Sequence, residues 1–201
     1  NGTLNLGSSS LLNMEGDQTL AGTGSIVFGA GGNNRVGVDG GSKTLTIASG
    51  VTIRGVDGSI GLGQLINGSG NAIINNGTIN SDGGGTITFT QSALVNNGLV
   101  RAQAGTMNVG VPLTGTGTLQ VDATGAMNLA AGAKTQGTLA MGAAGAALNL
   151  STGNLTLNTD YTNVGAGTGN SFNRRAGVTG TGQIVAGGNV SQVITGAAVT
   201  G

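Results

Sequence analysis

The sequence predicts an all-β fold: a parallel β-helix, or β-solenoid, with about 20 residues in each coil. Three observations support this prediction. Short phrases of alternating apolar and polar residues recur along the chain, Gly, Asn, Ser and Asp separate them, and equivalent phrases between residues 79 and 148 lie 19 to 21 residues apart. The regular placement of the apolar residues argues against disorder, which a glycine-rich, weakly charged composition would otherwise suggest.

Each phrase has the pattern of a short strand that is buried on one side. Alternation with period two is clear in residues 107–109 (MNV) and 119–121 (LQV), and this period is typical of a half-buried strand. A helix would need an apolar stripe of period 3.6, and glycine in a helix interior costs about 1 kcal/mol relative to alanine. Strands this short are not stable singly, so the fold has to stack them.

Equivalent phrases also share side-chain types, which favours a parallel solenoid over the alternative of an antiparallel sandwich or barrel. Three apolar columns are expected to cross successive coils: Ile87, Met107, Met127 and Leu148; Phe89, Val109, Leu129 and Leu150; Ile79, Val100, Leu119 and Leu139. Between the first two columns an outward polar ladder is expected, with coils about 4.8 Å apart: Thr88, Asn108, Asn128 and Asn149. The glycine that opens each phrase is expected to turn a corner with positive φ.

Towards the N-terminus the period is looser. Related phrases predict strands near residues 2–6, 12–14, 26–28, 45–47 and 52–53. The segment 29–41, which is rich in glycine and asparagine, is expected to be a loop that leaves a corner of the coil. Residues 1–201 are interpreted as one continuous solenoid of on the order of ten coils, a segment of a longer chain.

Composition excludes most catalytic chemistry. The 201 residues include 43 Gly, one Pro and no His, Cys or Trp, which excludes an ordinary zinc site and a Ser-His or Cys-His nucleophile. Seven basic and seven acidic residues give zero net charge, so neither nucleic acid nor an acidic membrane is an expected partner. No apolar run approaches the length of a membrane span. The sequence predicts no catalytic residue, no cofactor and no metal.

Two carboxylates come nearest to a catalytic pair. Asp82 and Asp122 occupy equivalent positions two coils apart, so their carboxylates are expected about 9 to 10 Å from each other. This separation approaches the spacing of an inverting glycosidase, but aspartate at a strand end is also ordinary turn chemistry, and Arg101 is the one other titratable group nearby. The segment around Asp39 is similar to a calcium-binding nonapeptide. That motif binds calcium only as tandem copies, and this chain has a single copy, so Asp39 is not expected to bind a metal.

The segment 160–178 departs most clearly from the pattern. It contains the one tyrosine of the chain, an isolated phenylalanine and two adjacent arginines: Tyr161, Phe172, Arg174 and Arg175. Aromatic and arginine side chains dominate binding hot spots, and loops on rigid scaffolds carry function. These four residues are therefore the candidate contact loop for a host-surface protein or glycan. The plainer interpretation is that the aromatic residues close a wider coil and the arginines are solvated.

Several phrases resemble the repeats of bacterial autotransporter passengers and filamentous-haemagglutinin-like adhesins. The resemblance covers roughly residues 60–195 and is clearest in residues 73–89 (IINNGTINSDGGGTITF) and 94–109 (LVNNGLVRAQAGTMNV). It implies a right-handed parallel β-helix at the bacterial surface or secreted, acting as a stalk or adhesion scaffold. The alternatives are a fibre-forming extracellular matrix protein whose solenoid units stack end to end and, more distantly, a polysaccharide-active enzyme.

Neither end of the sequence has the charged edge residues that prevent solenoids from stacking. Residues 1–14 begin directly with a strand phrase, and residues 180–201 contain no charged side chain. We therefore expect the chain either to continue covalently into further coils or to associate end to end with another copy. Head-to-tail contact that does not close would produce an open filament.

Overall fold

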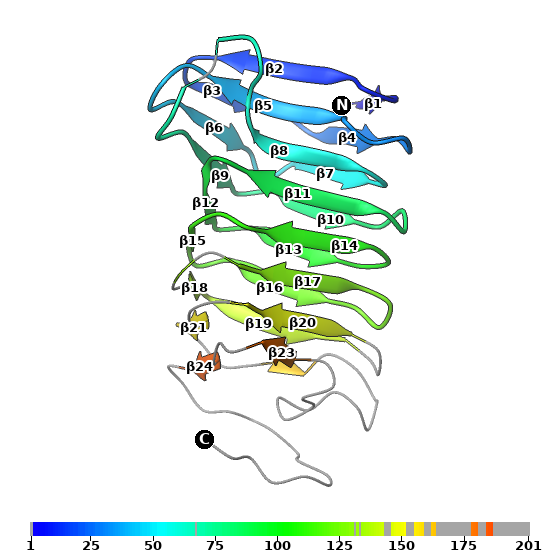
Figure 1. Ribbon diagram of the computed structural model, residues 1–201, viewed down its shortest axis with the longest axis vertical. Coiled ribbons are helices and arrows are strands. Elements are labelled where there is room, and N and C mark those ends of the chain that lie inside the picture. Colours follow the sequence, from blue (N-terminus) through cyan, green and yellow to red (C-terminus); the bar gives the residue numbers. More distant parts are fainter. Residues whose placement is uncertain are drawn as a thin grey trace, which may run out of the picture.

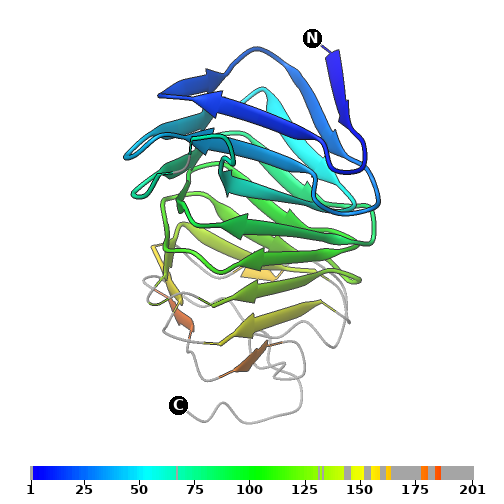
Figure 2. The same cartoon turned by 45° about the horizontal axis from the view of Figure 1, so that its top comes forward.

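The computed structural model confirms the all-β parallel solenoid. It describes residues 2–66, 68–130, 132, 134–142, 146–151, 155–158, 162–163, 178–180 and 184–186. These residues form 24 strands and no helix. The strands follow one another in sets of three, and each set makes one coil that stacks on the next along the long axis of the molecule (Figures 1 and 2).

The first and second strands of the coils form two eight-stranded parallel sheets. The first sheet contains β1 (Gly2–Leu6), β4 (Gly24–Phe28), β7 (Val51–Gly55), β10 (Thr78–Ser81), β13 (Leu99–Ala102), β16 (Thr118–Val121), β19 (Thr138–Met141) and β22 (Thr162–Asn163). The second contains β2 (Leu11–Glu15), β5 (Arg35–Asp39), β8 (Gly58–Leu62), β11 (Thr86–Thr90), β14 (Thr106–Val109), β17 (Ala126–Leu129), β20 (Ala147–Leu150) and β23 (Val178–Gly180).

The third strands form a five-stranded sheet followed by a three-stranded sheet. The longer one contains β3 (Gln18–Leu20), β6 (Thr44–Ile47), β9 (Ala72–Asn75), β12 (Ala93–Asn96) and β15 (Leu113–Thr114). The shorter one contains β18 (Lys134–Gln136), β21 (Leu155–Leu157) and β24 (Ile184–Ala186). The described residues thus make eight coils of three strands.

The strand register confirms the 20-residue period in the central coils and shows where it lengthens. Val100 lies opposite Leu119, and Met107 lies opposite Met127. Near the N-terminus, Ile26 lies opposite Ile53, 27 residues further along the chain. The additional residues are in the corner loops, so the strands keep their register while the length of the coil changes.

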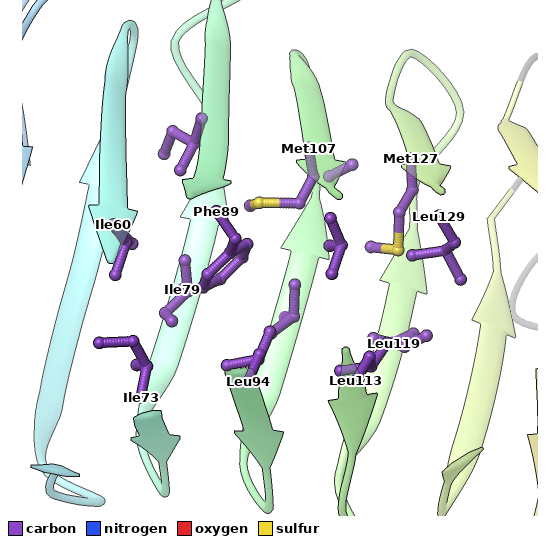
Figure 3. Packing of buried hydrophobic residues seen from close by; sticks show 14 of the residues in the cluster. Ile60, Ile73, Ile79, Phe89, Leu94, Met107, Leu113, Leu119, Met127 and Leu129 are labelled. Atoms are coloured by element: carbon purple, nitrogen blue, oxygen red, sulfur yellow. The ribbon is translucent and has the colours of Figure 1, made fainter. Parts of the chain in front are cut away.

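All three predicted apolar columns are present, and their described members are buried between the sheets. Figure 3 shows Ile79, Met107, Leu119 and Met127 pointing into this interior. The third strands add another apolar column, in which Ile73, Leu94 and Leu113 are fully buried. The interior is thus continuous from coil to coil, and each apolar side chain packs on its equivalent in the next coil.

The predicted outward ladder also has the expected register, with Asn108 between Thr88 and Asn128. The Nδ2 group of Asn128 donates to Oδ1 of Asn108 at 2.7 Å. Stacked asparagine side chains therefore add a hydrogen bond between coils outside the backbone ladder.

The expectation that residues 29–41 form a loop is wrong. β5 lies within this segment and pairs with both β2 and β8. Val36 and Val38 are fully buried, so the Val-Gly-Val phrase is a strand in which glycine takes the outward position. The strand was not predicted because glycines and asparagines, which are typical of loops, surround this short phrase.

The expected positive φ is found at Gly24, which opens β4, but not at the glycines that open the central phrases. Gly105, Gly117 and Gly125 are absent from the glycines that adopt positive φ in the described chain. They are required by close stacking instead: a Cβ on Gly117 would lie less than 3.0 Å from the carbonyl oxygen of Gly98 in the preceding coil. Gly105 and Gly125 meet the preceding coil's backbone in the same way.

Met127→Asp should unfold the coils around β17, because it places an unpaired carboxylate in the apolar interior at a cost of several kcal/mol. Asn128→Asp introduces the same group one residue away on the outer face and should cost about 1 kcal/mol, the value of one hydrogen bond. Thermal unfolding followed by circular dichroism measures both effects. Equal loss of stability in the two variants would contradict the inward and outward assignment of these positions.

Candidate functional site

The predicted contact loop lies outside the described residues. None of its four residues is described: Tyr161, Phe172, Arg174 and Arg175. Their assignment to partner binding therefore stays a prediction.

Asp82 and Asp122 occupy equivalent positions, as the sequence predicts. Asp82 directly follows β10 and Asp122 directly follows β16, and the register aligns the two strand ends through the intervening β13. Each carboxylate has its own arginine. Arg54 Nη1 contacts Asp82 Oδ2 at 3.0 Å, whereas Arg101 Nε donates to Asp122 Oδ2 at 2.8 Å.

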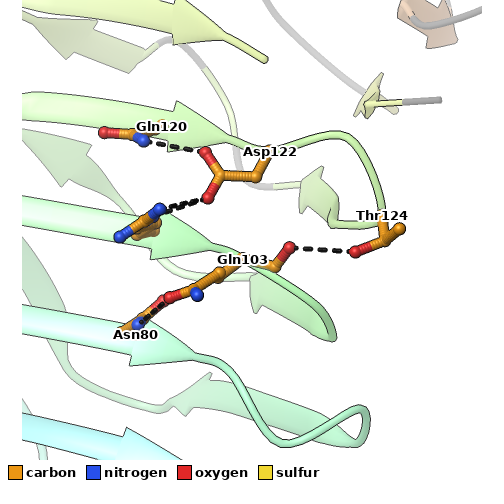
Figure 4. Close-up of polar contacts among 6 residues, drawn as sticks. Asn80, Gln103, Gln120, Asp122 and Thr124 are labelled. Atoms are coloured by element: carbon orange, nitrogen blue, oxygen red, sulfur yellow. Dashed lines mark hydrogen bonds and ion pairs between the residues drawn. The ribbon is translucent and has the colours of Figure 1, made fainter. Parts of the chain in front are cut away.

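These ion pairs belong to a polar stripe on the outer face of the first sheet. The stripe comprises Arg54, Asn80, Asp82, Arg101, Gln103, Gln120 and Asp122. Its contacts between coils follow one pattern: an outward side chain in one coil binds the residue that directly follows the strand of the next coil. Asn80 follows this pattern by donating from Nδ2 to Gln103 Oε1 at 2.8 Å (Figure 4).

In the stripe, the carboxylates of Asp82 and Asp122 each bind an arginine of the preceding coil. Asp122 also accepts a hydrogen bond from Gln120 Nε2 at 2.7 Å through its other oxygen, Oδ1. A glycosidase pair instead requires two carboxylates that face one substrate in a shared cleft. In this geometry the stripe ties β7, β10, β13 and β16 together and fixes their register.

A second polar ladder, which the sequence analysis missed, lies inside the solenoid. Asn75, Asn96 and Gln136 are all fully buried. Asn75 Nδ2 donates to Asn96 Oδ1, and Asn96 Nδ2 donates to Gln136 Oε1, both at 2.8 Å. The amide groups also donate to backbone carbonyls, as Gln136 Nε2 does to Thr114 O at 2.8 Å. These contacts supply the partners that buried polar groups require.

In the coil between Asn96 and Gln136, the equivalent position of the interior ladder is a glycine. Gly115 follows β15 at the place that Asn96 occupies at the end of β12, as the pairing of Leu94 with Leu113 shows. A Cβ on Gly115 would lie less than 3.0 Å from the carbonyl oxygen of Asn96. Gln136 is one methylene longer than asparagine, and its side chain reaches across this coil to Asn96.

The sequence signal for the interior ladder is the Asn-Asn-Gly corner at residues 75–77 and 96–98. The first asparagine of each corner points inward. The second lies outside, where Asn97 Nδ2 donates to Asn76 Oδ1 at 3.2 Å. One dipeptide therefore supplies both an interior and an exterior ladder.

Lys134 is a charged residue with an inward position, at 1% exposure. It begins β18, opposite Leu155 of the next coil, and its Nζ donates to the carbonyl oxygen of Gly132. Burial lowers the pKa of the Lys134 amine below the ordinary lysine value. An amine thus occupies a place where the adjacent coil has leucine.

Asp39 serves as an anchor for a loop. It is fully buried, and its Oδ2 accepts hydrogen bonds from Asn13 Nδ2 and from the backbone N–H groups of Leu65 and Ile66. The last two belong to the loop between β8 and β9. Across the described ranges, no three His, Cys, Asp or Glu side chains are grouped closely enough to hold a metal ion.

An apolar hollow of about 530 Å³ opens at the N-terminal end of the solenoid. Its walls include Leu4, Leu12, Met14, Leu20 and Ile26. Leu4 and Ile26 belong to one inward column that continues as Ile53 and Ile79 in the following coils. Within the described residues, the hollow therefore lies at the first coil, where this column begins.

Comparison with protein-family models, with curated proteins and with solved structures finds no match to this chain. In the part of the chain that the structure describes, no helix has the length and apolar character needed to cross a membrane.

Asn96→Ala should destabilise the protein by about 2 to 3 kcal/mol, because it removes the partner of two buried amides. Asn97→Ala is the matched control. It deletes the same group from the exposed adjacent position and should change the free energy of unfolding by less than about 0.5 kcal/mol. Urea unfolding of both variants measures the difference. Equal effects would contradict the interior position of Asn96.

Proposed function

We propose that this chain is a structural and adhesive segment of an extracellular bacterial protein, surface-bound or secreted, in which a stiff β-solenoid acts as a stalk or adhesion scaffold. The observation that carries this proposal is the continuous parallel stack of eight coils within the described residues. Backbone hydrogen bonds join consecutive coils along two faces throughout and along the third face except between β15 and β18, and the amide ladders and the polar stripe reinforce them. Such a stack resists bending and holds loops at fixed distances.

The use of the polar side chains supports a scaffold over an enzyme. Asp82 and Asp122 bind arginines of neighbouring strands, and the buried amides bind one another. Chemistry at these groups would require breaking the contacts that hold the coils together. A polysaccharide-active enzyme is accordingly the more distant alternative.

Extracellular placement and a host-surface protein or glycan as partner are proposals that rest on the resemblance to adhesin repeats. Binding is proposed for the predicted contact loop, because aromatic and arginine side chains on a rigid stalk form effective hot spots. A fibre-forming matrix protein is the second candidate, and the uniform parallel pairing of the strands favours it, because units that stack end to end would use the same pairing.

Adhesion tests the proposal directly. Beads coated with the chain should be retained on host-cell monolayers or glycan surfaces. Combined replacement of Tyr161, Phe172, Arg174 and Arg175 by alanine should reduce retention at least roughly tenfold, equivalent to about 1.4 kcal/mol of binding energy. Arg54→Ala, which removes an arginine from the side of the stalk, should leave retention unchanged.

Two outcomes would contradict the proposal. The first is retention that does not depend on the contact-loop residues. The second is hydrolysis of a polysaccharide that falls about a hundredfold or more in Asp82→Asn or Asp122→Asn, the size of a general acid–base contribution.

A further inference from the structure

The third strands of the coils, which form the third face of the solenoid, are interrupted at one point within the described residues. β12 pairs with β15, and β18 pairs with β21, but β15 and β18 belong to separate sheets although they follow each other along this face (Figure 1). On the other two faces the same coils are joined by the pairs β13 with β16 and β14 with β17. We call the junction between β15 and β18 the seam. Separating these two strands breaks no ladder of backbone hydrogen bonds.

One side chain bridges the seam from the interior. Gln136 of β18 is fully buried, and its Nε2 group donates to Thr114 O of β15 at 2.8 Å. Its Oε1 accepts a hydrogen bond from Asn96 Nδ2 of β12, also at 2.8 Å. The amide of Gln136 therefore connects β18 to both preceding strands of the third face, at the place where the backbone ladder is interrupted.

Backbone hydrogen bonds close the corners on either side of the seam. Before β18, Ala130 N donates to Val109 O at 3.0 Å, and after β18, Gly137 N donates to Gly117 O at 3.0 Å. The seam is thus a short stretch between two fixed corners. A separation of β18 from β15 would stay local, and it would leave the first and second sheets paired.

A lysine occupies the seam at an inward position. Lys134 is 1% exposed and lies opposite Leu155, and across the seam β15 begins with the fully buried Leu113. The surrounding strands β15, β16, β17, β19, β20 and β21 contain no charged residue. Asp122, which directly follows β16, binds Arg101 on the outer face. Burial in these surroundings lowers the pKa of the Lys134 amine, and opening of the seam would return the amine to water.

We propose that the seam is an opening point built into the stack: β18 separates reversibly from β15, the Gln136 side chain holds the seam closed, and hydration of the Lys134 amine favours the open state. The inference goes beyond the scaffold role and does not depend on adhesion. Local opening of this kind occurs where few interactions have to be broken. In a stalk under load, the wall of the solenoid yields first at the seam.

Acylation of lysine measures the opening in the intact chain, which has two lysines, Lys43 and Lys134. The probe is the N-hydroxysuccinimide ester of acetic acid, and mass spectrometry of the digested chain follows each residue. The partly exposed Lys43 gives the reference rate. Lys134 should react at least roughly tenfold more slowly, because it reacts only when the seam is open. Its rate should depend weakly on urea below the unfolding transition, since a local opening exposes little surface.

The pH dependence of the rate ratio tests the part assigned to the Lys134 amine. Its pKa is lowered in the closed state and returns to the ordinary lysine value in the open state. Between these two values the open state binds more protons, so opening becomes more frequent as the pH falls through this window, and it is constant below the closed-state pKa. The rate of Lys134 relative to Lys43 should rise accordingly. A ratio that does not change with pH would overturn the role of the amine.

Two buried amides of the interior ladder provide a matched pair of variants. Gln136→Ala removes the bridge and should raise the rate of Lys134 relative to Lys43 at least roughly tenfold. Asn75→Ala removes a buried amide from β9, away from the seam, and should leave this ratio unchanged. Gln136→Asn keeps an amide but is one methylene too short to bridge the seam, so it maintains the test if Gln136→Ala fails to fold. Circular dichroism verifies folding of each variant.

Three results would overturn the opening point. The first is acylation of Lys134 as fast as that of Lys43, which would mean that the amine is always accessible. The second is a Lys134 rate that follows urea as global unfolding does. The third is an equal response to Gln136→Ala and Asn75→Ala. None of these results depends on adhesion, so the retention experiment tests the proposed function separately.

Discussion

The close approach of one coil's backbone to the next is the constraint on which the rest of the structure depends. At the corner before the first sheet this approach leaves no room for a side chain: a Cβ on Gly77, Gly98, Gly117 or Gly137 would lie less than 3.0 Å from a carbonyl oxygen of the preceding coil. These four coils therefore return to the same position. Side chains of equivalent residues are stacked about 4.8 Å apart as a result, and each inward position becomes a column.

Stacking at this distance determines what the polar residues do. Asn75 and Asn96 bind each other inside, Asn108 and Asn128 bind each other outside, and Arg101 binds Asp122 diagonally across the first sheet. Apart from Gln120 with Asp122, the side-chain pairs of the polar stripe and of the amide ladders join different coils, so polar groups stabilise the stack while the apolar columns fill it. The proposed scaffold role depends on the stiffness of this stack.

The repeating parts of this arrangement could be predicted from the sequence. Met107 and Met127 share a side-chain type at the period of the coil, and Asp122 lies 21 residues from its partner Arg101. Arg54 was missed because it precedes Asp82 by 28 residues, across a coil lengthened by its loop. The inward orientation of Asn75 was missed because polarity alone predicts an outward residue. Its burial depends on Asn96 in the next coil, which is a property of the stack and not of the local phrase.

Replacement of single glycines tests the stacking constraint most directly. Gly117→Ala places a methyl group against the carbonyl oxygen of Gly98, whereas Gly110→Ala places the same group where no atom lies within 4 Å. Chemical unfolding should show that Gly117→Ala lowers the free energy of unfolding by about 1 to 3 kcal/mol. Gly110→Ala should leave it unchanged or raise it by up to about 1 kcal/mol, because alanine restricts the unfolded chain. Equal free energies of unfolding for the two variants would contradict the account.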